Sequence, residues 1–92
     1  LKQEEVFKGP LTSSLVHPRE VFATALRERS ASILVAHNHP SGDVEPSDED
    51  LAVTRRLEEA GRLIGIPLKD HLIIGRDRFL SLRAMGLLDG KG

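Results

Sequence analysis

The sequence predicts an α/β domain in which a small mixed β-sheet is packed between helices. Two segments carry apolar residues at helical spacing, and two short continuous apolar runs are rich in β-branched residues. These segments alternate along the chain as helix, strand, helix, strand and strand, an order typical of helices covering a sheet. With 92 residues, the chain has the size of a single small domain.

Four strands are expected. Residues 2–7 (KQEEVF) combine charged and apolar side chains and predict a strand with one solvated face, placed at an edge of the sheet. Residues 31–36 (ASILVA) and 68–75 (LKDHLIIG) are the apolar runs, and they predict buried strands, the first of them central in the sheet. Residues 79–82 predict a further short strand after a turn, the fourth in chain order.

Two amphipathic helices are expected between these strands. Pro18 is favoured at a first helical position, and residues 19–29 place apolar side chains on one face. The second helix begins at Ser47, where Ser-Asp-Glu-Asp resembles a capping box. This helix should end near Gly61 or Gly65, because glycine commonly follows the last helical turn.

The remaining segments are expected to be short or irregular. Residues 11–16 (LTSSLV) should be extended or looped, and residues 81–88 should close the domain with a short helix. Residues 89–92 should be frayed.

Composition excludes several classes of protein and site. Without cysteine, the chain cannot hold disulfides, a cysteine nucleophile or a Cys-ligated zinc ion, so any metal must be bound by His and carboxylate. The net charge of −1 argues against direct nucleic-acid binding, which usually requires a basic excess. No apolar run approaches the about 20 residues of a membrane span, and no leader is visible. We therefore expect a cytoplasmic protein without a membrane partner.

The most informative segment is His37-Asn38-His39 at the carboxyl end of a predicted strand. Residues i and i+2 of a strand point to one face, so both imidazoles could reach one ion. Asp50, in the first turn of the next helix, could supply a third ligand. Two His and one Asp with an open fourth position would suit catalytic zinc, whose bound water becomes a nucleophile near neutral pH.

A simpler interpretation accounts for the same residues. Two histidines in a loop are often surface residues, and Ser47 and Asp50 can be explained as a helix cap. Composition and periodicity do not decide between the two interpretations.

The full spacing H-x-H-x7-S-x2-D, formed by His37, His39, Ser47 and Asp50, resembles the signature of the JAMM, or MPN+, metalloprotease family. The segment HNHPSGDVEPSDED is similar in sequence to the same region of the RadC branch, bacterial proteins long labelled as DNA repair proteins. The flanking segments HPREVFATALRERSASILVAHNHPSG, TRRLEEAGRLIGIPLKDHLIIG and SLRAMGLL extend the resemblance over nearly the whole chain.

The resemblance implies an MPN-like fold and a Zn²⁺ ion held by His37, His39 and Asp50. It implies that Ser47 hydrogen-bonds the oxyanion of the tetrahedral intermediate. The activity implied is that of a hydrolase, a zinc metallopeptidase or isopeptidase that acts on a peptide or isopeptide substrate. Two alternatives stay open: a metal-dependent, DNA repair-associated nuclease, and a non-catalytic MPN binding module.

The resemblance also places a general-base glutamate upstream of residue 1, so the chain is expected to be an MPN domain without its N-terminal portion. Glu4, Glu5 and Glu20 are candidates by default, although Glu20 is better explained by the helix dipole. His71 either lines the cleft and supports a ligand or is a hydrogen-bonded structural histidine. The edge strand at the N-terminus could pair between chains and form a homodimer.

Overall fold

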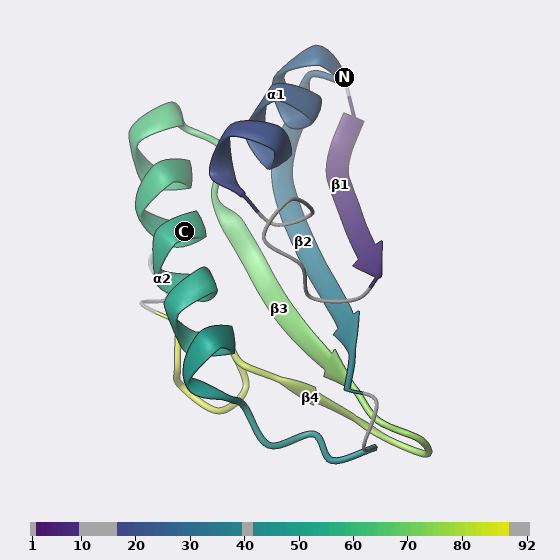
Figure 1. Ribbon diagram of the computed structural model, residues 1–92. Coiled ribbons are helices and arrows are strands. Elements are labelled where there is room, and N and C mark those ends of the chain that lie inside the picture. The colour runs from purple at the N-terminus through teal and green to yellow at the C-terminus, as the bar shows by residue number, and fades with distance from the viewer. Residues whose placement is uncertain (1, 10–16, 40–41, 89–92) are drawn as a thin grey trace.

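The computed structural model describes residues 2–9, 17–39 and 42–88. These residues form four strands and two helices (Figure 1). In chain order, the elements are β1 (Lys2–Gly9), α1 (Pro18–Arg27), β2 (Ser30–Asn38), α2 (Asp48–Ile64), β3 (Leu68–Ile74) and β4 (Phe79–Ser81). The predicted strands and both amphipathic helices are therefore confirmed. The expectations for residues 11–16 and 89–92 lie outside the described residues.

The strands form one mixed sheet in the order β1-β2-β3-β4. Strands β1, β2 and β3 run parallel, and β4 pairs antiparallel with β3. As predicted, β2 is an interior strand and β1 lies at an edge of the sheet. The predicted fold class, an α/β domain with a small mixed sheet, is confirmed.

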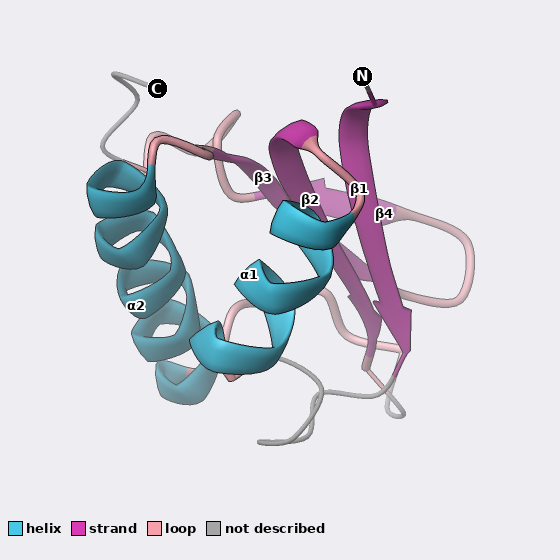
Figure 2. Cartoon of the chain, turned by 90° about the horizontal axis from the view of Figure 1, so that it is seen from above, coloured by secondary structure: helices cyan, strands magenta, loops and turns pink. Residues whose placement is uncertain are grey.

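Both described helices cover the same face of the sheet (Figure 2), so within the described residues the sheet is not packed between helices as the sequence predicted. Each connects two neighbouring parallel strands, and both crossovers advance across the sheet in the same direction. Since such crossovers are nearly always right-handed, consecutive helices are placed on one side. None of the described helices is long and apolar enough to span a membrane.

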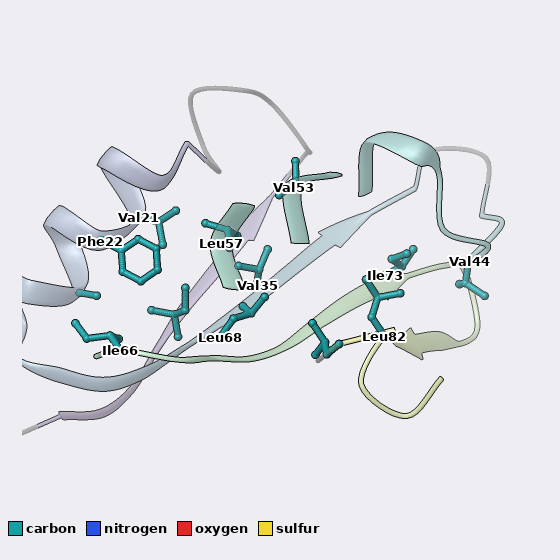
Figure 3. Packing of buried hydrophobic residues seen from close by; sticks show 13 residues of the cluster. Val21, Phe22, Val35, Val44, Val53, Leu57, Ile66, Leu68, Ile73 and Leu82 are labelled. Atoms are coloured by element: carbon teal, nitrogen blue, oxygen red, sulfur yellow. The ribbon is translucent and has the colours of Figure 1, made fainter. Parts of the chain in front are cut away.

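The hydrophobic core lies between these helices and the covered sheet face (Figure 3). Alternate residues of the strands, among them Ile33 and Val35 on β2 and Ile73 on β3, are buried there. They pack against apolar residues of the helices, which include Val21, Phe22, Ala25, Val53 and Leu57. The core therefore holds α2 against β2 and β3, the two strands that end beside its first turn.

The helix ends follow the sequence signals closely. The side chain of His17 accepts a hydrogen bond from the amide of Arg19 at 3.1 Å, and α1 begins at Pro18 as expected. Helix α1 ends at Arg27, two residues before the predicted end, and Arg29 takes a left-handed φ of 56° on the way into β2. Helix α2 ends at Ile64, with Gly65 at φ 88° as its left-handed cap.

The prediction of a short helix over residues 81–88 is wrong, because the structure has turns at residues 82–86 after β4. The Asp70 carboxylate accepts hydrogen bonds from the Ser81 hydroxyl and from the amide of Arg83. Gly86 has a left-handed φ of 77°, which stops helical propagation. So short a segment cannot offset the cost of helix nucleation, and Asp70 stabilises a turn instead.

Candidate metal centre

The predicted histidines and aspartate meet where β2 ends beside the first turn of α2. His37 is the penultimate residue of β2, and His39 follows that strand. The amide of His39 donates to the carbonyl of Ile74 at 3.1 Å, which anchors this position to the end of β3. Asp50 lies in the first turn of α2 and is completely buried.

Both imidazoles contact the Asp50 carboxylate. His37 Nε2 lies 2.9 Å from Asp50 Oδ1, and His39 Nε2 lies 3.0 Å from Asp50 Oδ2. The His37 side chain is 1% exposed, whereas that of His39 is 18% exposed. The cluster is thus enclosed on the His37 side and open to solvent on the His39 side.

Helix capping fixes the Asp50 carboxylate. The amide of Ser47 donates to Asp50 Oδ2 at 2.7 Å, and the amide of Asp50 donates to Ser47 Oγ at 3.1 Å. Burial by itself would raise the pKa of Asp50, but hydrogen bonding by Ser47 and the nearby His37 and His39 hold this pKa below its ordinary value. Asp50 is therefore a buried carboxylate that stays ionised.

A hydrogen bond at the other ring nitrogen of His39, Nδ1, fixes the orientation of its side chain. His39 Nδ1 lies 2.7 Å from the backbone carbonyl oxygen of Asp43. A carbonyl only accepts, so Nδ1 carries the hydrogen. In the neutral ring, Nε2 then presents a lone pair to Asp50. This is the form in which histidine binds metal ions.

On its other side, His37 begins a second set of buried polar contacts, which ends at the backbone of α2. His37 Nδ1 lies 2.9 Å from His71 Nε2, and His71 Nδ1 lies 2.7 Å from Thr54 Oγ1. The Thr54 hydroxyl donates to the backbone carbonyl of Asp50 at 2.8 Å. Burial lowers the pKa of His37 and lowers that of His71 to about 4, with the neighbouring histidine adding to the effect at His71. His71 is therefore neutral at pH 7.

Two overlapping groups of side chains could hold a metal. Ligand atoms of His37, Asp50 and His71 lie within 4.8 Å of one another, and His39 contacts the same carboxylate. His37 Nε2 and Asp50 Oδ1 are buried and have no hydrogen-bond partner among the described residues. A bond between them would need a proton on Nε2, so the pair fits a cation that both atoms can coordinate.

The other sequence candidates lie differently. Ser47 is exposed at the start of α2, next to the open side of the cluster. Glu20 is exposed on α1, lies 3.8 Å from the Arg19 side chain and is not among the described side chains close enough together to hold a metal. Sequence reasoning missed Thr54. Its position four residues after Asp50, one helical turn on, is the signal that could have found it.

The chain is similar over most of its length to bacterial proteins of one family. Residues 1–87 match the model of the family described as RadC-like JAB domain. The chain is 53% identical over 88 residues to a UPF0758 protein of Clostridium perfringens and 58% identical over 88 residues to one of Staphylococcus epidermidis. Each match covers 96% of this chain and 39% of the relative.

A further relative, a UPF0758 protein of Listeria innocua, is 57% identical over 84 residues, which cover 91% of this chain and 38% of the relative. The chain thus spans about two fifths of the length of these relatives, and their names state no activity. The resemblance drawn from the histidine motif is confirmed: the chain belongs to the RadC-like JAB domain family.

Proposed function

We propose that the protein is a zinc-dependent peptidase or isopeptidase whose metal is held by His37, His39 and Asp50. The observation that supports this most strongly is the pair of buried polar atoms without a hydrogen-bond partner, His37 Nε2 and Asp50 Oδ1, which face each other at 2.9 Å. His39 adds an imidazole nitrogen on the solvent side of the same carboxylate. A His-His-Asp donor set with one open side is typical of catalytic rather than structural zinc.

The chain's own residues have distinct tasks in this proposal. When bound, zinc supplies a Lewis acid and lowers the pKa of a coordinated water. Asp50 is held in place by the Ser47 amide, so the ligand set needs little rearrangement. The exposed Ser47 hydroxyl lies at the positive end of α2, where it can donate a hydrogen bond to a substrate oxygen that gains negative charge. Glu20 has no part in this proposal, because it is exposed and paired with Arg19.

Zinc binding is tested by elemental analysis of the purified protein after reconstitution with zinc and gel filtration. We expect one zinc per chain in the unmodified protein and a large loss in His39→Ala. The matched control is His17→Ala, which removes an exposed histidine of the α1 cap and should keep the metal. Equal, negligible zinc in the unmodified protein and in His39→Ala would refute the site.

Peptidase activity is tested separately, on the whole protein and with peptide and isopeptide substrates. Ser47→Gly is the informative variant, because glycine at a helix N-cap costs only a few tenths of a kcal/mol whereas alanine costs about 1 kcal/mol. Loss of an oxyanion donor should lower kcat about 10²- to 10³-fold, with stability and zinc content retained. Zinc binding without turnover would instead favour a binding module, and metal-dependent cleavage of DNA would favour the nuclease alternative.

A further inference from the structure

A line of buried polar groups runs from the metal side of His37 through β3 to the backbone of α2. Its members are His37, His71 and Thr54, which are 2%, 0% and 1% exposed, and it ends at the carbonyl oxygen of Asp50. The successive contacts measure 2.9 Å, 2.7 Å and 2.8 Å. We call these three side chains the relay. The proposed mechanism makes no use of His71 or Thr54.

The direction of every hydrogen bond in the relay follows from its fixed end. The Asp50 carbonyl can only accept, so the single hydroxyl hydrogen of Thr54 is donated to it. The oxygen of Thr54 must then accept from His71, which places the hydrogen of the neutral His71 ring on Nδ1. His71 Nε2 is consequently an acceptor, and the hydrogen on His37 must be on Nδ1.

We propose that Thr54 and His71 are positioning residues that fix the tautomer of His37, so that His37 Nε2 keeps its lone pair for the metal. The inference rests on the proposed metal site, but not on peptidase activity. It also decides between the two overlapping ligand groups. The metal belongs with His37, His39 and Asp50, and His71 supports a ligand without being one.

The alternative, with His71 as a ligand in place of His39, conflicts with the same contacts. His71 Nε2 would have to leave His37 Nδ1, whose hydrogen would then be buried without an acceptor. His71 Nδ1 is engaged with Thr54, and the residue is fully buried. His39 is the partly exposed member of the cluster, on the side from which a substrate can approach.

Removal of the Thr54 hydroxyl should reverse the direction of the hydrogen bond between His71 and His37. In Thr54→Val, a hydrogen on His71 Nδ1 would have no acceptor, so the ring should move its hydrogen to Nε2. That hydrogen would face His37 Nδ1, and His37 would in turn carry its own hydrogen on Nε2, next to Asp50. The lone pair that the metal needs would then be available only at an energetic cost.

The first measurement reads the tautomers in the zinc-free whole protein by long-range ¹H–¹⁵N correlation of the imidazole nitrogens at pH 7.5. We expect the hydrogen on Nδ1 in both His37 and His71, and a shift of His37 toward the Nε2-H form in Thr54→Val. Thr54→Ser retains the hydroxyl and should keep the unmodified pattern. A hydrogen on Nε2 of His37 in the unmodified protein would overturn the inference, whether or not zinc binds.

The second measurement is zinc affinity, by competition with a chromophoric chelator. Loss of a group that supports a ligand typically weakens metal binding 10- to 100-fold. We expect this for Thr54→Val and at most a few-fold change for Thr54→Ser. The matched control is Val53→Ala, which removes neighbouring buried volume outside the relay and should keep the unmodified affinity. The inference would be contradicted if folded Thr54→Val bound zinc as tightly as the unmodified protein. It would also be contradicted if Thr54→Val and Val53→Ala lost zinc affinity equally.

The third measurement assigns the ligands directly. In the protein loaded with ¹¹³Cd, coupling of the metal to ring nitrogens should be seen for His37 and His39 and not for His71. Coupling to His71 would overturn the assignment of His71 as a supporting residue. If the protein binds neither zinc nor cadmium, the proposed function fails while the tautomer measurement still decides the relay.

Discussion

Acid should destabilise the metal-free protein through His71. Burial in the core lowers the pKa of this imidazole from 6.5 to about 4 in the folded protein. As the pH falls below 6.5, the unfolded chain therefore takes up a proton that the folded protein does not. This difference in proton uptake lowers the free energy of unfolding as the pH falls from 6.5 to about 4. Above pH 6.5, His71 has little effect on the pH dependence of stability.

The size of the effect follows from the difference between the two pKa values. Each tenfold difference in proton affinity is worth about 1.4 kcal/mol, so the whole window is worth about 3 kcal/mol. Between pH 7 and pH 5, the expected loss through His71 is about 2 kcal/mol. For a domain of this size, that is a substantial part of the total stability.

Urea denaturation with a chelator present, followed by circular dichroism at pH 7, 6 and 5, measures this loss. The comparison is His71→Gln, because an amide oxygen can accept from His37 in place of His71 Nε2 while the titrating group is gone. The variant should lose about 2 kcal/mol less than the unmodified protein over this range. His17→Gln removes an exposed histidine and should change the slope less than His71→Gln does. Parallel curves for the unmodified protein and His71→Gln would refute the reasoning.

Three further predictions concern a core residue, a glycine beside the candidate metal centre, and zinc itself. Leu57→Ala should lower the free energy of unfolding by about 2–5 kcal/mol, because Leu57 is 0% exposed, whereas Leu63→Ala, at an 85% exposed position, should have little effect in the same urea titration. Gly75→Ala would place a Cβ 2.5 Å from the carbonyl oxygen of Gly42, so the backbone at one of these two residues must shift, and a chelator competition should show weaker zinc binding. Zinc at about 100 times its Kd should stabilise the protein by about 2.7 kcal/mol, and a chelator should remove this gain in a thermal melt.

Local sequence signals predicted the helices and the strands and made His37, His39 and Asp50 candidate ligands, because each depends on nearby residues. The choice of metal binding over a simple helix cap came from the family resemblance. Apolar spacing determines the buried face of a helix, and His37 and His39 share a face because they are two residues apart in a nearly extended chain. Asp50 follows within one loop and the first turn of a helix that a capping signal starts. Such short connections leave few alternative arrangements.

The relay could not be predicted in this way because it depends on the register between two parallel strands. Ile33 pairs with Leu68, but Leu34 pairs with Asp70, so one residue of β3 is skipped between them. A one-residue slip exchanges the two faces of a strand. Without this irregularity, His71 would point away from α2 and could not contact both His37 and Thr54. A single sequence carries no local signal for such a bulge.

Asp50 shows why capping and metal binding are not competing explanations of the same residues. The capping box orients the Asp50 carboxylate, since the Ser47 amide holds Oδ2 at 2.7 Å and Asp50 N–H is bound by the Ser47 hydroxyl. The same orientation leaves Oδ1 facing His37 at 2.9 Å and Oδ2 facing His39 at 3.0 Å. The helix cap therefore satisfies part of the hydrogen bonding of a carboxylate that is buried in the first turn of α2, where the proposed metal site requires it. A divalent cation bound between this carboxylate and the two imidazoles would neutralise the negative charge that remains on Asp50.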